Sequence, residues 1–236
     1  MLLVALLACS GPVEAPPPRP VVLAVREGPG PLLNVVADRG ADLDLAHHLQ
    51  VPLVPWRDGA ARPAWATDWS WSGDGRRLTL TLASDRAWSD GTPLTPADLA
   101  LAWELVRDPD VVSPLLRHAA GLSEQSPVVL DDTHVAFDFE APGLPARALW
   151  NLSRVLPVPA HRLADADRAT LRGHPEARTP LSSGRWLLAA HDPGSHFRLD
   201  ANPRSLDGTA SPQVLWRVLP DAAAQRIDFE RGELDS

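Results

Sequence analysis

The stretch that decides the fold covers residues 63–108 and reads PAWATDWSWSGDGRRLTLTLASDRAWSDGTPLTPADLALAWELVRD. Within it, Leu78, Leu80 and Leu82 alternate with threonines. Alternation of apolar and polar residues predicts a strand that buries one face. Asp90-Gly91 follows, and this dipeptide is typical of a turn. The stretch therefore begins with a half-buried strand that ends before a turn.

A helix is predicted immediately after this turn. Thr95 is a favourable N-cap, Pro96 suits the first helical position, and Asp98 occupies the third. Leu99 and Trp103 recur at helical spacing and give the helix an apolar stripe. The order of elements is therefore a strand, a turn and an amphipathic helix.

These residues also carry a resemblance to a known family. The stretch resembles the signature region of the extracytoplasmic solute-binding proteins of family 5, the peptide- and nickel-binding receptors of ABC importers. One departure is Ala83-Ser84, where the family usually has a basic residue after the strand. The residues that match the family pattern are Trp69, Ser72, Asp74, Gly75, Trp88, Ser89, Asp90, Gly91, Pro93, Leu94, Thr95 and Asp98.

The resemblance covers nearly all of residues 21–236 and ends on Gly232-Glu233-Leu234-Asp235, which matches the family's Gly-Glu-Leu-Asp. It implies an α/β fold class, a lobe like lobe I of a type 2 periplasmic binding protein, with a mixed β-sheet. In relatives the chain crosses a hinge soon after this motif and builds a second lobe. We therefore expect residues 21–236 to form an N-terminal lobe that stops before the second lobe.

The composition excludes one class of partner. A hydrophobic fraction of 44% and a charged fraction of 22% are typical of a globular protein. The net charge of -8 and the isoelectric point near 5.4 argue against nucleic acid as a partner, since proteins that bind it usually carry a basic surface. The chain also lacks G-x-S-x-G, H-E-x-x-H and Cys-His patterns. We therefore expect neither catalysis nor a cofactor.

The function that the resemblance implies is the substrate-binding component of an ABC importer for oligopeptides or similar solutes. Its partners would be a peptide or small solute and an ABC permease in the membrane. An alternative is a single-lobe interaction lipoprotein that has lost transport and whose exposed sheet edge is covered by another chain. A third hypothesis is a hydrolase that uses Ser183, although its sequence context matches no catalytic arrangement.

The N-terminus predicts a lipid anchor. Residues 2–8 are wholly apolar, and Cys9, the single cysteine, follows them at once. Leu6-Leu7-Ala8-Cys9 fits a bacterial lipobox, although the basic residues that usually open a signal peptide are missing. The simpler alternative is an apolar terminus with a chance cysteine. We expect residues 1–9 to be a lipoprotein signal segment, residues 10–20 a proline-rich linker, and the protein to be periplasmic and membrane-anchored.

Three residues are candidates for ligand binding. In relatives, the segment after the first strand borders the ligand cleft, and here that segment contains Asn34 and Asp38. In some relatives an arginine faces the ligand near the position of Arg154. The alternatives are turn or capping roles for the first two and a surface position for the third. No metal site is predicted, because the histidines match no metal-ligand spacing.

Two other features leave alternatives open. Residues 179–186 (TPLSSGRW) resemble a tight crossing loop of the family in which Ser182 and Ser183 replace a glycine and a threonine, so we expect a relaxed version. Four tryptophans crowd one region, where they form either a ligand platform or, more commonly for this residue, part of the core. These tryptophans are Trp65, Trp69, Trp71 and Trp88.

The rest of the chain shows the same alternation of strand and helix signals. Apolar runs, alternation and turn residues predict a buried strand at 21–25, a hairpin at 128–140, paired strands at 185–190 and 196–200, a strand at 214–219 and a helix at 222–231 that Asp221 caps.

Overall fold

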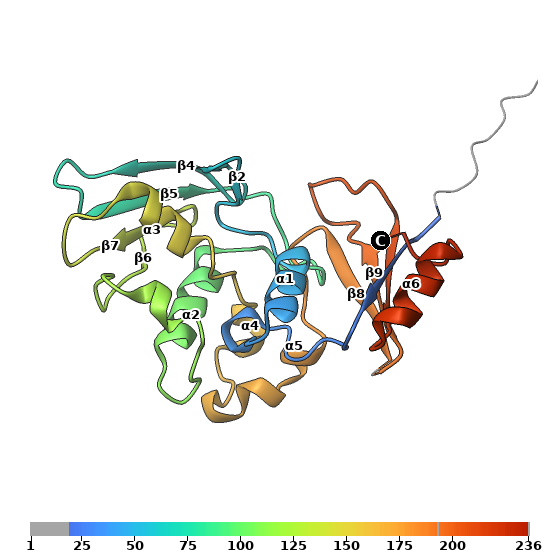
Figure 1. Cartoon of the computed structure of the whole chain (residues 1–236). Coiled ribbons are helices and arrows are strands. Elements are labelled where there is room, and N and C mark those ends of the chain that lie inside the picture. Colours follow the sequence, from blue (N-terminus) through green and yellow to red (C-terminus); the bar gives the residue numbers. More distant parts are fainter. Residues whose placement is uncertain (1–18, 193, 236) are drawn as a thin grey trace, which may run out of the picture.

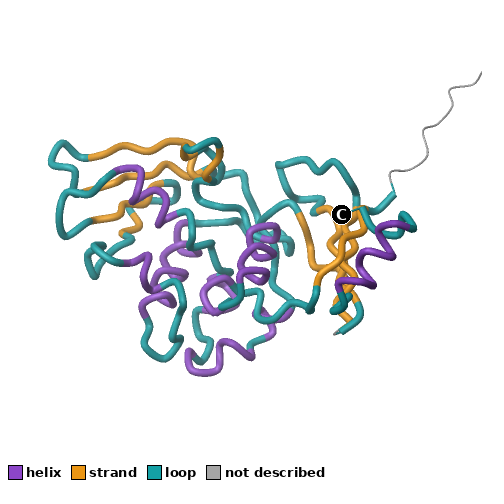
Figure 2. Tube along the Cα trace, in the orientation of Figure 1, coloured by secondary structure: helices purple, strands orange, loops and turns teal. Residues whose placement is uncertain are grey.

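Two four-stranded sheets lie at opposite ends of the molecule, with the helices α1 (Gly40–Leu49), α4 (Ala160–Leu163) and α5 (Pro175–Arg178) between them (Figure 1). The computed structural model describes residues 19–192 and 194–235. The first sheet has the strand order β4-β5-β7-β6, and the second has the order β1-β10-β9-β8. Figure 2 shows that long loops connect the two ends. The arrangement confirms an α/β fold.

The first sheet confirms the strand predicted from the leucine–threonine alternation. Its four antiparallel strands are β4 (Ala66–Trp71), β5 (Arg77–Leu82), β7 (His134–Asp138) and β6 (Val128–Val129). Leu78 and Leu80 of β5 are fully buried, while the threonines after them are half-buried. Leu80 pairs with Trp69 on one side and with Val135 on the other. The hairpin predicted at 128–140 is therefore the other half of the same sheet.

Helix α2 (Pro96–Arg107) begins where the sequence predicts it. The backbone N–H of Thr95 donates to the carboxylate of Asp98 at 2.7 Å, as in a capping box. Trp103 lies on the buried face, and its ring meets that of Phe137 edge to face with centroids 5.8 Å apart. The helix therefore covers the first sheet with the apolar stripe that its spacing predicts.

The second sheet is mixed, as expected. It consists of β1 (Val21–Val25), β10 (Gln213–Val218), β9 (His196–Ala201) and β8 (Trp186–Asp192). Strand β1 is parallel to β10, while the other pairs are antiparallel. All five residues of β1 are only half-buried, so the prediction of a buried strand is wrong in this respect. Strand β10, which lies inside this sheet, is also half-buried throughout, because the cluster of buried apolar residues beside the sheet is small.

The loop at residues 179–186 is a tight crossing, and the expectation of a relaxed loop is wrong. A Cβ on Gly184 would lie 2.9 Å from backbone atoms of Leu49, at the end of α1. The hydroxyl of Ser183 donates to the side-chain oxygen of Gln50 at 2.9 Å and adds to the crossing. Ser183 is 3% exposed, so its hydroxyl is engaged in the fold, which argues against the hydrolase hypothesis.

The remaining elements are short. Helix α6 (Ala222–Glu230) confirms the prediction of a helix after Asp221, whose side chain accepts a hydrogen bond from the N–H of Ala223 at 2.6 Å. Besides α2, the helices of eight residues or more are α1 (Gly40–Leu49), α3 (Pro145–Leu152) and α6 (Ala222–Glu230). The short elements are β2 (Trp56–Arg57), β3 (Ala60–Ala61), α4 (Ala160–Leu163), α5 (Pro175–Arg178) and the 3-10 helices η1 (Asn34–Val36), η2 (Leu116–Ala119) and η3 (Arg168–Gly173).

Candidate functional site

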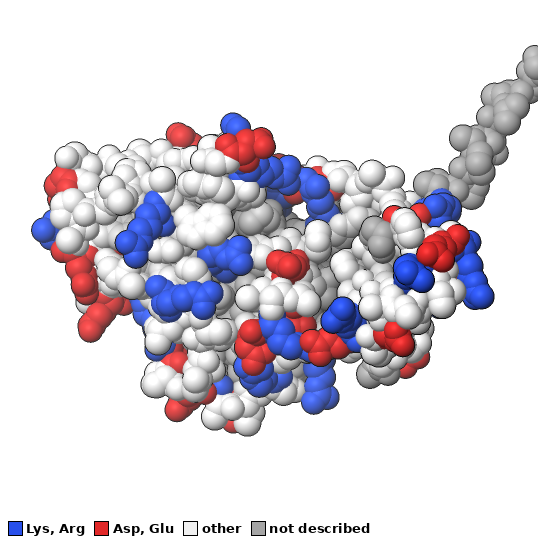
Figure 3. All heavy atoms as spheres, viewed as in Figure 1, with Lys and Arg blue, Asp and Glu red and all other residues white. Residues whose placement is uncertain are grey.

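An open cleft with a volume of about 1050 Å³ lies between the two ends of the molecule. Its lining comes from the end of α1, the β2–β3 hairpin, the loop before α2, the end of α3, the crossing loop, the β9–β10 loop and β10. Figure 3 shows basic side chains on this side of the molecule between α3 and α1 and along the upper rim. Because these segments are far apart in the sequence, only the tertiary fold assembles the site.

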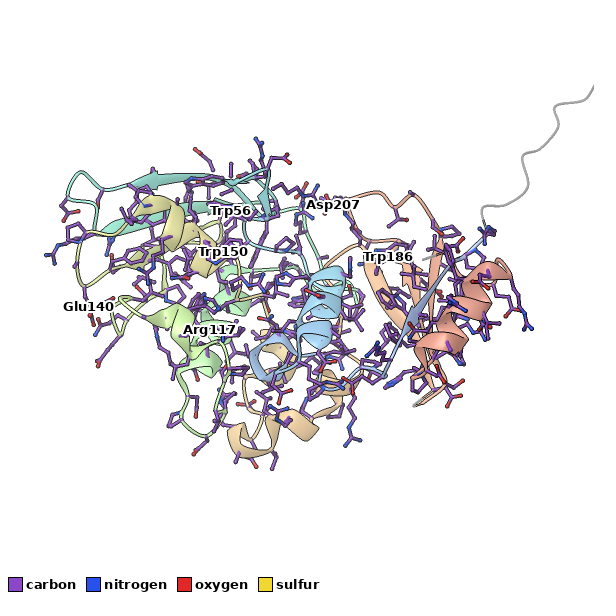
Figure 4. All side chains as sticks on the ribbon, in the orientation of Figure 1. Trp56, Arg117, Glu140, Trp150, Trp186 and Asp207 are labelled. Carbon is purple, nitrogen blue, oxygen red and sulfur yellow. The ribbon has the colours of Figure 1, made fainter. Side chains whose placement is uncertain are left out.

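Two tryptophans form one wall of the cleft. Trp56 begins β2 and Trp150 lies in the last turn of α3, and both are labelled in Figure 4. Their rings meet edge to face, with centroids 5.7 Å apart and an interplanar angle of 87°. Trp150 is 43% exposed. The pair therefore offers a ligand a large apolar contact surface.

Arg154 lies beside this pair. Its guanidinium carbon is 5.7 Å from the centroid of the Trp150 ring, which is within cation–π range. Ser153, which caps the C-terminus of α3, is buried and brings the chain to this position. Of the three predicted ligand-binding residues, Arg154 is therefore the one that lines the cleft.

An ion pair joins the two sides of the cleft. A guanidinium nitrogen of Arg86, in the loop before α2, lies 3.2 Å from a carboxylate oxygen of Asp207, in the β9–β10 loop. The side chain of Arg86 is only 11% exposed. The pair connects the loop of the second sheet to the part of the molecule that holds the first.

His47 contributes a neutral ring to the cleft. Burial and, as a smaller cause, the nearby charge of Arg154 together lower the pKa of His47 to about 4. Its Nε2 atom is buried and has no hydrogen-bond partner among the described residues. At neutral pH the ring is therefore uncharged, and this nitrogen is enclosed by the protein.

The other two predicted site residues do not line the cleft. Asn34 is 2% exposed, and its side-chain oxygen accepts a hydrogen bond from the N–H of Leu156 at 3.1 Å. Asp38 lies on the surface, where it pairs with Arg172 at 3.1 Å. In this structure Asn34 therefore has a structural contact and Asp38 a surface ion pair, and their roles in ligand binding stay predictions.

The four crowded tryptophans belong mainly to the core. Trp65 and Trp88 are fully buried, while Trp69 and Trp71 are half-buried and pack against the core from β4. None of the four lines the cleft. The interpretation of this cluster as core is confirmed, and the tryptophans of the cleft lie elsewhere in the chain.

Sequence reasoning missed Trp56 and Trp150, although a signal for the second was available. In α3 the buried positions are Ala148, Leu149 and Leu152. Trp150 falls outside that face, so a large aromatic side chain projects from the exposed side of an amphipathic helix. A tryptophan on the polar face of a helix is a reason to look for a binding surface.

Membrane attachment concerns mainly the part of the chain before the first strand. Cys9, the predicted lipid anchor, lies outside the described residues, as does most of the predicted linker at 10–20. Within residues 19–192 and 194–235, no helix combines the length and the apolar character needed to cross a bilayer.

Comparisons with known proteins show which family the sequence of this chain matches. The family model of the bacterial extracellular solute-binding proteins, family 5 (middle), matches residues 60–236. The chain is 39% identical over 199 residues to the probable deoxycholate-binding periplasmic protein YgiS of Escherichia coli K12, covering 76% of this chain and 36% of that protein. It is 33% identical over 131 residues to the periplasmic murein peptide-binding protein MppA of the same organism, covering 50% of this chain and 23% of MppA.

Solved structures share the fold. The oligopeptide-binding protein AppA of Bacillus subtilis, in complex with a nonapeptide, superposes with a TM-score of 0.85 at 18% identity. The superposition covers 93% of this chain and 44% of that one. The chain thus spans less than half the length of the relatives it matches. On the family match and the identity to these relatives, the chain belongs to the bacterial extracellular solute-binding proteins of family 5.

Proposed function

We propose that this protein is the substrate-binding component of an ABC importer and takes an oligopeptide or similar solute in the cleft. The observation that carries the proposal is the open cleft of about 1050 Å³, walled by Trp56, Trp150 and Arg154, in a chain of family 5. Relatives in this family carry names that refer to murein peptide, oligopeptide and nickel binding. A permease in the membrane would then receive the solute.

The cleft has the size and the chemistry of a solute site. Binding sites for small molecules typically have volumes of roughly 300 to 1000 Å³, with apolar walls and a few polar groups that fix orientation. Here the tryptophan pair supplies the apolar wall, and Arg154 and His47 supply polar groups beside it. In such receptors two lobes close over the ligand by a hinge motion. An open cleft in one lobe is one half of that arrangement.

We also propose that the protein is held outside the cytoplasm by a lipid on Cys9. The support is the apolar run at residues 2–8 directly before the single cysteine. Labelling cells with radioactive palmitate should yield a labelled membrane-bound protein, and Cys9→Ser should release an unlabelled protein into the extracytoplasmic fluid. An unlabelled wild-type protein would contradict the anchor without bearing on ligand binding.

Ligand binding can be tested by titrating tryptophan fluorescence with a series of di- to pentapeptides. Because the cleft is open to solvent, we expect saturable changes with dissociation constants on the order of 0.1 to 1 mM. Trp150→Ala should abolish most of the change. Trp186→Phe is the matched control, since Trp186 lies on β8 outside the lining of the cleft (Figure 4). Equal responses in both variants would show that the peptides bind elsewhere.

A further inference from the structure

A second, smaller pocket lies beside the cleft. It has a volume of about 140 Å³, and its walls come from α1, the loop after β1 and the strands β9 and β10. Asp44, His48 and Trp216 line both this side pocket and the cleft, so the two spaces adjoin. One molecule of liquid water occupies roughly 30 Å³. The side pocket therefore has room for roughly four or five atoms of that size, which corresponds to the end of a ligand whose remainder lies in the cleft.

The side pocket differs from the cleft in charge. Five arginines and three aspartates line the cleft, whereas three carboxylates and no arginine line the side pocket. A concave surface of one sign concentrates groups of the opposite sign. The lining of the side pocket therefore favours a cationic group.

Two of the three carboxylates are engaged by a single arginine from outside the lining. The Nε atom of Arg39 lies 2.7 Å from a carboxylate oxygen of Asp42, and another nitrogen of the same guanidinium lies 3.2 Å from Glu27. Asp42 also accepts a hydrogen bond from the N–H of Gly30 at 2.8 Å. These contacts tie the loop after β1 to α1. They fix this wall of the side pocket and leave the third carboxylate for a ligand.

This third carboxylate belongs to Asp44. The residue is exposed on α1 and forms no ion pair or side-chain hydrogen bond with any described residue. Its neighbour His48 brings no positive charge at neutral pH, because partial burial lowers the pKa of His48 although Asp44 acts in the opposite direction. The side pocket therefore contains a carboxylate that solvent reaches and that has no cationic partner within the described residues.

The rest of the lining suits an aliphatic chain. The rings of Phe197 and Trp216 stack with centroids 5.4 Å apart and an interplanar angle of 12°. Leu45 of α1 and Val25 of β1 also line the side pocket. Apolar walls of this kind contact the methylene groups of a long basic side chain, and aromatic rings attract its charged end.

Resting on the proposed solute-binding function, we propose that the side pocket takes a primary ammonium group carried on a short aliphatic chain. The ammonium pairs with Asp44, and its methylene groups contact Phe197 and Trp216. A lysine side chain of a peptide and a free alkylamine share this chemistry. The two sources are distinguished by the choice of probes.

The test is calorimetric titration with two pairs of probes that differ in charge. The first pair is the tripeptide Ala-Lys-Ala and its analogue with 6-hydroxynorleucine, in which a hydroxyl replaces the ammonium. The second pair is pentylamine and 1-pentanol. We expect the charged member of at least one pair to bind about fivefold more tightly, since an exposed carboxylate and an aromatic ring each attract a cation modestly. The pair that shows the preference identifies the source.

Substitutions locate this preference. Asp44→Asn should abolish it and leave the uncharged probes binding as before. Asp165→Asn is the matched control, because Asp165 is an exposed aspartate outside the lining of both the cleft and the side pocket. A preference that persists in Asp44→Asn would overturn the inference, because the ammonium would then bind elsewhere.

A second measurement reports on the side pocket without relying on affinity. Incorporation of 5-fluorotryptophan gives each tryptophan a fluorine signal, and Trp216→Phe identifies the signal of Trp216. Saturating pentylamine should shift this signal, whereas the signal of Trp103 in the core should not move. An unshifted Trp216 signal at saturation would overturn the inference even if a charge preference is found.

The inference and the proposed function fail on different results. Peptides that bind with equal affinity for the charged and uncharged members, together with equal affinities for the amine and the alcohol, would overturn the inference and leave the proposed function standing. Pentylamine that is preferred over 1-pentanol and shifts the Trp216 signal, while no peptide binds, would support the side pocket and count against an oligopeptide as the solute.

Discussion

The core beneath the first sheet and the open cleft use the same residue types in opposite ways. Trp103 is fully buried in the core, whereas Trp150 in the cleft is 43% exposed. Arg77, on the exposed surface of the sheet above this core, pairs with Asp138 at 2.6 Å, whereas Arg154 pairs with no described carboxylate. The contrast teaches that stability and ligand recognition depend on separate side chains. Substitutions should therefore separate the two properties.

The largest effect is expected from removing a core tryptophan. Trp103→Ala should lower the free energy of unfolding by about 3 to 5 kcal/mol, because it leaves a large cavity against β7. The matched variant Trp150→Ala should lower it by less than about 1 kcal/mol, since the side chain is already partly in water. Urea denaturation followed by circular dichroism measures both.

Ligand binding is the control measurement for the variants Trp103→Ala and Trp150→Ala. Trp150→Ala should weaken peptide binding while the protein stays folded. Comparable losses of stability in the two variants would show that the wall of the cleft is part of the core and would remove the contrast between the regions.

The second largest effect is expected at the crossing loop, which belongs to both regions. Gly184→Ala should cost about 3 kcal/mol of stability, because a Cβ would lie 2.9 Å from the backbone of Leu49, and backbone cannot move aside cheaply. Gly143→Ala is the control, since a Cβ there meets nothing within 4 Å. Equal thermal denaturation midpoints for the two variants would show that the crossing loop can relax.

The contrast also explains what could be predicted from the sequence. The strand at Leu78–Leu82 and the helix after Thr95 depend on local signals, namely alternation, a cap and spacing, and both were predicted correctly. Of the cleft, only Arg154 was named. Trp56 and Trp150 are 94 positions apart in the chain, and no local pattern shows that their rings meet. The tightness of the crossing at Gly184 likewise depends on Leu49, which is distant in sequence.

A smaller effect, and one confined to the cleft, is expected from pH. Burial and Arg154 lower the pKa of His47 to about 4 in the folded protein, while an unfolded histidine titrates near its ordinary value of 6.5. Between these values the unfolded chain binds the proton and the folded protein does not. Stability should therefore fall as the pH drops from 7 to 5, by on the order of 2 kcal/mol from this residue.

His47→Gln should remove this part of the pH dependence. Urea denaturation of wild type and variant at pH 7 and pH 5 would measure it, and the variant should lose less stability over the interval. Identical losses would mean that His47 is solvated and titrates normally, and the cleft would then lack the uncharged ring described above.

The smallest effect is expected from the ion pair that closes the side of the cleft. A double-mutant cycle with Arg86→Gln and Asp207→Asn should give a coupling energy of about 0.5 to 1 kcal/mol, because Asp207 is partly in water. The coupling should shrink in concentrated salt, which screens such a pair. A coupling well above 2 kcal/mol that is insensitive to salt would show that the β9–β10 loop is held as firmly as the core. The cleft would then be a rigid part of the fold. Its lining residues would stabilise the protein as well as bind a ligand, and the two regions would not differ in this respect.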